Sequence, residues 1–357
     1  MSNRGSNTYR EIMSQPQVWA EAIDVFRSKA QALSQLWNRN PAEQVIFSGC
    51  GSTYYLSVTA AAIFQYLTGV PAQSFPASEL VLFPDRVYLK DMSILLVAVS
   101  RSGETTETIK AIPIFRKKTG GRVIAITCNS NNTLTKQADL SLAVDAAQEE
   151  SIAQTRSFAS MLILAQALAK HLGGKDFDYF PSLPSIGERL LSDYEEIARK
   201  LGEDKKYEKF FFLGSGLLNG VANEAMLKMK EMSLTYSEAF HTLEFRHGPM
   251  SIVDEQTLVV GLISENATSQ EVAVLRDMRE LGAGILAIME SSNDEITSLG
   301  EVVQLETKLP AWARPVTYLP ILQLMAYYRS LAKGLDPDHP TNLAHVVHLD
   351  SLTSDGQ

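Results

Sequence analysis

The chain has 357 residues, of which 45% are hydrophobic and 20% charged, and its 41 acidic and 32 basic side chains give a formal net charge of −9. This length predicts two domains, and the acidic balance argues against nucleic acid or an anionic membrane as a partner. Two cysteines, a polar N-terminus and the lack of a long apolar run predict a cytoplasmic protein without a signal peptide or membrane span. The cysteines and the six histidines show no metal-binding spacing, so we expect neither a metal nor another cofactor.

The chain begins with a stretch typical of helices and then repeats one pattern of strands and helices. In residues 1–40, apolar residues recur at steps of three and four, which predicts a helical lead-in. Short apolar runs then alternate with helix-like segments. The runs that predict strands cover 44–49, 94–99, 120–129 and 139–144 in a first copy, and 209–216, 257–264, 282–292 and 301–306 in a second.

The two copies are offset by about 160 residues throughout, which indicates a duplicated domain. The alternation predicts an α/β fold in which each copy is a doubly wound, flavodoxin-like parallel sheet flanked by helices. We expect the first domain over residues 41–185, the second over 186–335 and a C-terminal tail over 336–357. Long helices over 151–205 would join the two copies.

Polar stretches follow three of the expected strands in the first copy. Ligands of doubly wound sheets bind beyond the carboxyl ends of the strands, so these stretches mark a candidate site. All three are rich in Ser, Thr, Asn and Gly: GCGSTYY (49–55), SRSGETTE (100–107) and TCNSNNT (127–133).

The stretch SRSGETTE has the composition of an anion-binding turn. Gly103 permits a backbone conformation that other residues avoid, and a helix is expected from Glu104 onward, capped by Ser102 or a neighbour. Free N–H groups at such a helix start, together with nearby hydroxyls, suit a phosphate monoester. A helix cap without any ligand explains the same residues. The turn matches neither of the glycine-rich nucleotide motifs.

Three further segments resemble a known family. They are NEAMLKMKE (223–231), EAFHTLEFRHGP (238–249) and DHPTNLAHVVHL (338–349). Their order and spacing, together with the hydroxyl turn, resemble the sugar isomerase (SIS) family of phosphosugar enzymes, and in particular the isomerase half of glucosamine-6-phosphate synthase. The resemblance extends over nearly the whole chain and implies two SIS-type subdomains.

The resemblance implies a set of site residues. Glu231 would be the base that moves a proton between C1 and C2 of the sugar, and His247, supplied by the neighbouring subunit of a homodimer, would assist ring opening. Lys228 and Glu224 share a helical face with Glu231, so Lys228 could steady the carboxylate or a developing enolate. The candidates for binding the phosphate and the sugar hydroxyls are Gly51, Ser52, Thr53, Ser100, Arg101, Ser102, Thr105 and Gln154.

The chain departs from the synthase pattern in three places. Arg101 stands where the synthase turn has glutamine, and an arginine there could contact phosphate directly. His345 replaces the lysine of the C-terminal tail, which in the family contributes to the active site. We expect no glutaminase domain before the isomerase-like half. The chain resembles instead the stand-alone members of the family, which are aminosugar-6-phosphate deaminases, ketose–aldose isomerases and deglycases of fructosamine phosphates. The segment FRHGP (245–249), together with the extended second half, looks most like the deaminase group.

The leading hypothesis is therefore a homodimeric deaminase/isomerase that converts glucosamine 6-phosphate to fructose 6-phosphate and ammonia, with a final hydrolytic step. One alternative is a deglycase of fructosamine 6-phosphates, and another is a ketose–aldose isomerase of phosphosugars. Both would use the same proton transfer, and the substrate in every case would be a phosphorylated hexosamine or ketose. A non-catalytic phosphosugar sensor is a third alternative from a different class.

Each candidate residue also has a simpler interpretation. Glu231 could be a solvated helix residue, and Lys228 one half of a helix ion pair. His247 could be an ordinary turn residue before Gly248. Arg101 could lie on the surface, and His345 could be a packing or surface residue without the match of the tail.

Overall fold

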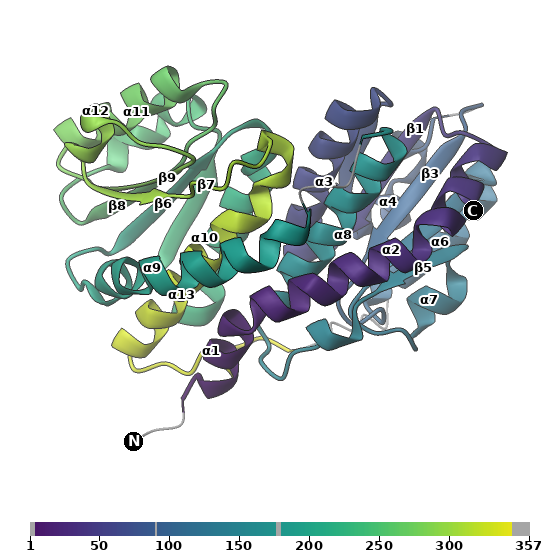
Figure 1. The fold of residues 1–357 in the computed structure, drawn as a ribbon, viewed down its shortest axis with the longest axis horizontal. Helices are drawn as coiled ribbons and strands as arrows, with labels where there is room; N and C mark the ends of the chain where they lie inside the picture. The colour runs from purple at the N-terminus through teal and green to yellow at the C-terminus, as the bar shows by residue number, and fades with distance from the viewer. Residues whose placement is uncertain (1–3, 90, 176–179, 345–357) are drawn as a thin grey trace. The chain divides into compact units, whose positions relative to one another are not determined.

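The structure, a computed structural model, describes residues 4–89, 91–175 and 180–344 (Figure 1). The chain divides into two compact units. Unit 1 takes residues from Met1–Pro16, Glu150–Thr155 and Ser182–Leu343, and unit 2 takes residues from Gln17–Glu149 and Arg156–Pro181. No helix within the described ranges is both long and apolar enough to cross a membrane.

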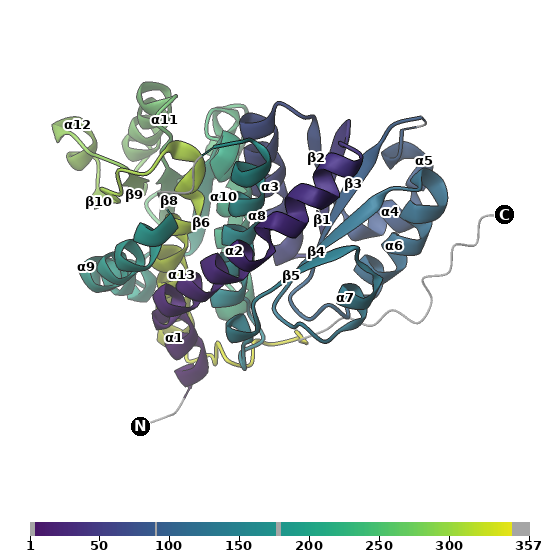
Figure 2. The ribbon, with the colours of Figure 1, turned by 45° about the vertical axis from the view of Figure 1, so that its right-hand side comes forward.

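Unit 2 contains the first parallel sheet. Its strands, in the spatial order β2-β1-β3-β4-β5, are β1 (Gln44–Gly49), β2 (Ala72–Pro76), β3 (Ile94–Val99), β4 (Arg122–Thr127) and β5 (Leu140–Ala143). The helices associated with this sheet are most of α2 (Gln15–Arg39), then α3 (Ser52–Thr68), α4 (Ala77–Leu82), α5 (Pro84–Val87), α6 (Thr106–Thr119), α7 (Thr133–Gln137) and α8 (Arg156–Leu172). Helices α3 and α8 lie on one face of the sheet, and α4 and α6 on the other (Figure 2).

Unit 1 contains the second parallel sheet. Its strands, in the order β10-β9-β8-β6-β7, are β6 (Lys209–Gly214), β7 (Tyr236–Phe240), β8 (Thr257–Leu262), β9 (Gly284–Met289) and β10 (Glu301–Gln304). Its helices are α1 (Ser6–Met13), α9 (Leu183–Glu203), α10 (Asn219–Ser233), α11 (Thr268–Glu280), α12 (Asp294–Thr297) and α13 (Pro315–Ala332). Helices α11 and α12 lie on one side of the sheet, and α9, α10 and α13 on the other (Figure 1).

The two sheets have the same topology. Read from the opposite end, the second order is β7-β6-β8-β9-β10, so β1 corresponds to β6 and β3 to β8. This is the flavodoxin-like order, and the prediction of two doubly wound parallel sheets is confirmed. The order reverses between β1 and β3 in one sheet and between β6 and β8 in the other. Ligands of such sheets bind beyond the carboxyl ends of the strands at this point of reversal.

The buried strands explain why the sheets form where they do. Strands β1, β3, β8 and β9 are buried at every position, as continuous apolar runs in parallel sheets are. One core lies between the first sheet and α4, α6 and α7 and includes Leu96, Ile112 and Phe115. The corresponding core under α11 includes Phe211, Val259 and Leu275. Rigid cores of this kind hold the carboxyl ends of the strands in place.

Candidate functional site

The first candidate region lies in unit 2, at the loops that follow β1 and β3. These strands pair directly, with Ser48 opposite Ala98, so the two loops leave the sheet side by side at its reversal point. Each loop leads into a helix, α3 after β1 and α6 after β3. The N-termini of α3 and α6, which are the positive ends of their dipoles, therefore lie at this edge of the sheet. They favour the binding of an anion there.

The loop after β3 is shaped by Gly103 and by its own hydroxyls. Gly103 has φ +69°, and a Cβ placed there would overlap the side chain of Asn132. Its N–H donates to Ser100 Oγ at 3.1 Å, and Ser100 Oγ lies 3.1 Å from Thr105 Oγ1. Ser102 Oγ accepts the N–H of Glu104 at 3.1 Å. The predicted positive φ is confirmed, and the hydroxyls of the turn are gathered within one short loop.

The helix after this loop begins two residues later than predicted. α6 starts at Thr106, and its N-cap is Thr105, not Ser102. Thr105 makes no side-chain capping bond, because its hydroxyl faces Ser100 instead. The side chain of Thr105 therefore does not cap α6, and the N-terminus of a helix favours a bound anion.

The turn from β1 into α3 contains three predicted residues with different surroundings: the N-cap and the first two residues of the helix. Gly51 is the N-cap of α3 and has φ +55°, a conformation that suits glycine. Ser52 and Thr53 are both buried. The hydroxyl of Thr53 donates to the carbonyl of Cys50 and accepts its N–H, both at 2.9 Å. Thr53 therefore shapes the turn, and its part in binding stays a prediction.

Cys50 lies in the same turn and is half-buried. Burial, followed by the charge of Glu107, raises the pKa of its thiol to about 11. The thiol is therefore protonated at neutral pH and is not prepared to act as a nucleophile.

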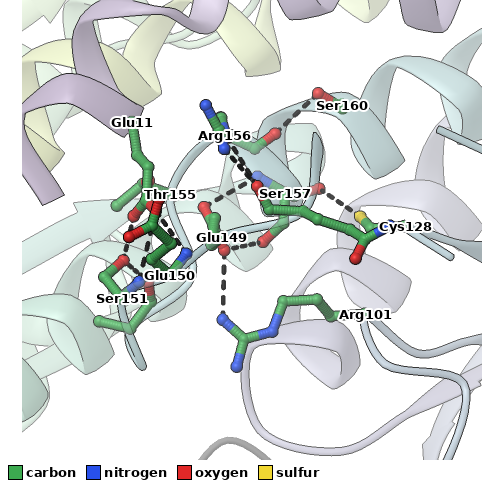
Figure 3. A network of polar contacts seen from close by, with 12 residues as sticks. Glu11, Arg101, Cys128, Glu149, Glu150, Ser151, Thr155, Arg156, Ser157 and Ser160 are labelled. Atoms are coloured by element: carbon green, nitrogen blue, oxygen red, sulfur yellow. Dashed lines mark hydrogen bonds and ion pairs between the residues drawn. The ribbon is translucent and has the colours of Figure 1, made fainter. Parts of the chain in front are cut away.

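Arg101 is tied to a buried carboxylate that the sequence did not single out. Its Nη1 lies 3.2 Å from Glu149 Oε2, and the two side chains are 11% and 0% exposed. Glu149 also accepts the N–H of Ser157 at 3.0 Å and the Ser157 hydroxyl, at the N-terminus of α8 (Figure 3). The interpretation of Arg101 as a surface residue is wrong. The only sequence signal for Glu149 was an acidic residue just before an expected helix.

The second candidate region lies in unit 1, on helix α10. Its Lys228 is 1% exposed and forms ion pairs with Glu231 and, at 3.5 Å, with Glu224. Glu224 is fully buried, whereas 20% of the Glu231 side chain is exposed. The helix packs between β6 and α13, so these charges lie in an otherwise apolar layer. The shared helical face predicted for the three residues is observed.

This arrangement leaves one of the two carboxylates partly exposed. A buried ammonium between two carboxylates offsets part of the cost of burying them and holds each in a fixed position. Glu231 is the member that solvent or a ligand can reach. Lys228 does form ion pairs within its helix, as the simpler interpretation expected, but its side chain is buried.

His247 lies on an exposed segment of the same unit. It follows the short 3₁₀ turn Glu244–Arg246 and is exposed, while the neighbouring Phe245 is buried in the core under α11. Arg246 Nε donates to Asp277 Oδ2 at 2.7 Å and ties the segment to α11. The imidazole is therefore presented outward from a well-anchored backbone.

Gln154 lies in the short segment Glu150–Thr155 of unit 1. Its Oε1 is buried and has no hydrogen-bond partner among the described residues. Glu11, fully buried on α1, accepts the N–H of Glu150 at 2.6 Å and the hydroxyl of Ser151 and so fixes this segment (Figure 3). No motif pointed to Glu11; a glutamate beside Ile12 on the apolar face of the lead-in was the available signal.

The predicted site residues thus form two groups. Unit 2 holds Gly51, Ser52, Thr53, Ser100, Arg101, Ser102 and Thr105, and unit 1 holds Gln154, Glu224, Lys228, Glu231 and His247. His345 lies outside the described residues. Within the described ranges no cluster of three or more His, Cys, Asp or Glu side chains could hold a metal ion.

The repeated fold matches a known sequence family. The pattern of the SIS domain matches residues 40–171 and 205–331, which together make up more than half of the chain. The chain belongs to the SIS-domain family. It is 29% identical over 356 residues to glutamine–fructose-6-phosphate aminotransferase (isomerizing) of Thermococcus kodakarensis, covering 95% of the chain and 57% of that protein. The chain thus spans little more than half of this relative.

Solved structures of the family have the same fold. Glucosamine-6-phosphate deaminase of Thermotoga maritima is 28% identical and has a TM-score of 0.72, over 92% of the chain and all of that structure. Tagatose-6-phosphate ketose/aldose isomerase of Escherichia coli has a TM-score of 0.82 over 93% and 96% of the two chains, at 23% identity, a likeness of fold alone. These proteins are enzymes, in agreement with the prediction of an enzyme.

Proposed function

We propose that the chain is an aminosugar-6-phosphate deaminase/isomerase that converts glucosamine 6-phosphate and water to fructose 6-phosphate and ammonia. The observation that carries the proposal is the carboxylate of Glu231, accessible at the edge of α10 and held by the buried Lys228. The similarity to the T. maritima deaminase, over the full length of that structure, supports the same reaction class.

In this proposal the loops after β1 and β3 bind the phosphate. The N-termini of α3 and α6 supply backbone N–H groups, and Ser100, Ser102 and Thr105 supply hydroxyls. Arg101 adds a cationic donor, whose charge is balanced by Glu149 until the ligand enters. Gly51, Ser52 and Thr53 complete this set in unit 2, and Gln154 stays a predicted binding residue of unit 1.

The proton transfer would be carried by α10. After ring opening, assisted by His247, the Glu231 carboxylate removes the proton at C2 and an enolamine forms. Glu231 then returns the proton to C1, which gives a ketimine, and water hydrolyses the ketimine to the ketose phosphate and ammonia. A positioned base contributes about 10²- to 10⁴-fold to such a step. Lys228 and Glu224 act as positioning residues for Glu231.

The proposal includes a homodimer in the cytoplasm. His247 is exposed on an anchored segment, which suits a residue that completes the site of a second subunit. His345 and the tail, expected to contribute to the site, stay part of the proposal as predictions. Neither nucleic acid nor a membrane is expected as a partner.

Two other activities would use the same base. A deglycase of fructosamine 6-phosphates would release a larger amine, and a ketose–aldose isomerase would release none. Both need Glu231, so the products separate the three enzymes. A sensor without catalysis would not need an accessible base beside a buried lysine.

The test is the formation of ammonia and fructose 6-phosphate from glucosamine 6-phosphate by the purified full chain. We expect both products from the wild-type enzyme and a loss of about 10²- to 10⁴-fold in kcat for Glu231→Gln. Glu280→Gln, an exposed change on α11, is the matched control and should keep wild-type activity. Release of no ammonia from glucosamine 6-phosphate would exclude this reaction, and fructosamine and ketose phosphates would then identify the alternative.

A further inference from the structure

A pocket lies in unit 1, at the carboxyl ends of β8 and β9. It has a volume of about 270 Å³. Its lining comes from the loops after the two strands, the start of α11 and the residues just before α12: Ile263, Ser264, Glu265, Thr268, Met289, Glu290, Ser291, Ser292 and Asn293. Because β8 corresponds to β3, this pocket occupies the position in the second sheet that the hydroxyl loop after β3 occupies in the first.

The loop after β8 is not built to bind an anion. The N–H of Ser264 donates to Glu271 Oε2 at 2.7 Å, so a carboxylate of the protein already takes this donor. The Thr268 hydroxyl donates to the carbonyl of Ser264 at 2.7 Å. Burial raises the pKa of Glu271, whose other oxygen has no hydrogen-bond partner among the described residues. The donors that would bind a phosphate are therefore occupied.

The charges that line the pocket are mainly negative. Glu265 and Glu290 both belong to the lining, and both pair with one guanidinium, that of Arg314, at 2.8 and 3.3 Å. Arg314 is 9% exposed, whereas half of the Glu265 side chain is exposed. Two carboxylates against one arginine leave an excess of negative charge, which repels phosphate and attracts a cation.

Glu290 is fixed in this position by the chain itself. It accepts the N–H of Lys308 at 2.6 Å and the hydroxyl of Thr307 at 2.8 Å. Its side chain is 15% exposed. A carboxylate held by three partners presents a preorganised acceptor, which lowers the entropic cost of binding a ligand.

We propose that this pocket binds a small hydroxylated primary amine without a phosphate group, such as an unphosphorylated amino sugar. The ammonium group would contact the carboxylates of Glu265 and Glu290. The hydroxyls of Ser291 and Ser292 and the amide of Asn293 suit the hydroxyl groups of such a ligand. A volume just below the roughly 300–1,000 Å³ of drug-sized sites fits a molecule of monosaccharide size.

The experiment is a calorimetric titration of the purified full chain with glucosamine, glucose and inorganic phosphate. We expect glucosamine to bind, and glucose to bind at least tenfold more weakly because it lacks the ammonium group. Glu265→Gln and Glu290→Gln should each weaken the binding of glucosamine tenfold or more. Glu280→Gln, an exposed change of the same kind in the same unit, should leave it unchanged.

Two further variants separate this pocket from the proposed active site. Ser102→Ala in the first sheet and Glu231→Gln on α10 should leave the affinity for glucosamine unchanged. The proposal is overturned if glucosamine does not bind, if neither Glu265→Gln nor Glu290→Gln weakens binding, or if Ser102→Ala removes it. Should Glu290→Gln fold poorly in a thermal melt, Glu265→Gln decides, since its side chain is half exposed. The result is independent of turnover.

Discussion

The two sheets of this protein have the same topology, but the helices and loops that follow their strands carry different charged residues. Helix α3 follows the first strand of the first sheet and contains no charged residue. Helix α10 follows the corresponding strand of the second sheet and carries Glu224, Lys228 and Glu231, of which the first two are buried. Burying such charges is costly, so their presence in only one of the two equivalent helices indicates a function rather than a requirement of the fold.

The loops after the central strands β3 and β8 also differ in their side chains. The loop after β3 has an arginine, several hydroxyls and a glycine with φ +69°, whereas the loop after β8 has Glu265 and no glycine. Ala267, the N-cap of α11, has an ordinary φ of −133°. Duplication thus preserved the scaffold while the side chains of the two halves diverged. Under the proposed function, the first half would bind the anion and the second half would carry the proton transfer.

The largest effect on stability is expected from removing the buried lysine of α10. Lys228→Met leaves Glu224 buried without its cation, which should lower the free energy of unfolding by about 3–5 kcal/mol. Lys230→Met, two residues away in an exposed pair with Glu238, should change it by no more than about 1 kcal/mol. Urea unfolding measures both. Equal effects of the two variants would show that the burial of Lys228 carries no special role.

A smaller effect is expected at the two loop positions that precede the helices. Gly103→Ala introduces a Cβ in a left-handed conformation against Asn132 and should cost about 2 kcal/mol or more. Ala267→Gly needs no change of conformation and should cost at most about 1 kcal/mol. Thermal melts of the two variants test this prediction. An unchanged melting temperature in Gly103→Ala would contradict the claim that the loop after β3 needs a glycine at this position.

The arginine of the loop after β3 should matter for anion binding. Arg101→Gln is expected to weaken the binding of inorganic phosphate about tenfold or more, because a charge-assisted hydrogen bond is lost. Arg116→Gln, which alters an exposed pair with Asp139 in the same unit, is the control. Phosphate titrations followed by NMR give both affinities. An unchanged affinity in Arg101→Gln would confine this residue to its pair with Glu149.

The smallest effect concerns the two cysteines of unit 2. With a pKa of about 11, about one Cys50 thiol in a thousand is ionised at pH 8, so alkylation by iodoacetamide should be slow. The thiolate fraction rises with pH, so the rate should increase about tenfold per pH unit up to the pKa. Cys128 is fully buried and should react only after unfolding. Rapid labelling of Cys50 at pH 8 would contradict the burial of the first turn.

Most of the fold could be predicted because eight of the described strands contain a short run of apolar residues. The two strands that were missed, β2 and β7, are both paired only with the first strand of their sheet, β1 or β6. Their sequences, AQSFP and YSEAF, are polar and mostly half-exposed. Such strands depend on pairing with a neighbour, which a local pattern does not reveal.

Only those parts of the candidate site that belong to local sequence motifs could be predicted. The turn with Gly103 and the helical face of Glu231 follow from local spacing. Glu149 and Glu11 do not, because each acts through residues that are far away in the sequence or lie in a segment without a pattern. Whether Arg101 was buried also depended on Glu149, so the sequence left that question open.

The measurement that tests the division of tasks most directly is the steady-state kinetics of Ser102→Ala and Glu231→Gln on glucosamine 6-phosphate. We expect Ser102→Ala to raise KM about tenfold with kcat nearly unchanged, because it loses a binding contact in the first half. Glu231→Gln should lower kcat about 10²-fold or more with KM nearly unchanged, because it loses the base. A wild-type kcat in Glu231→Gln, or a loss of kcat equal to that of Glu231→Gln in Ser102→Ala, would contradict the account.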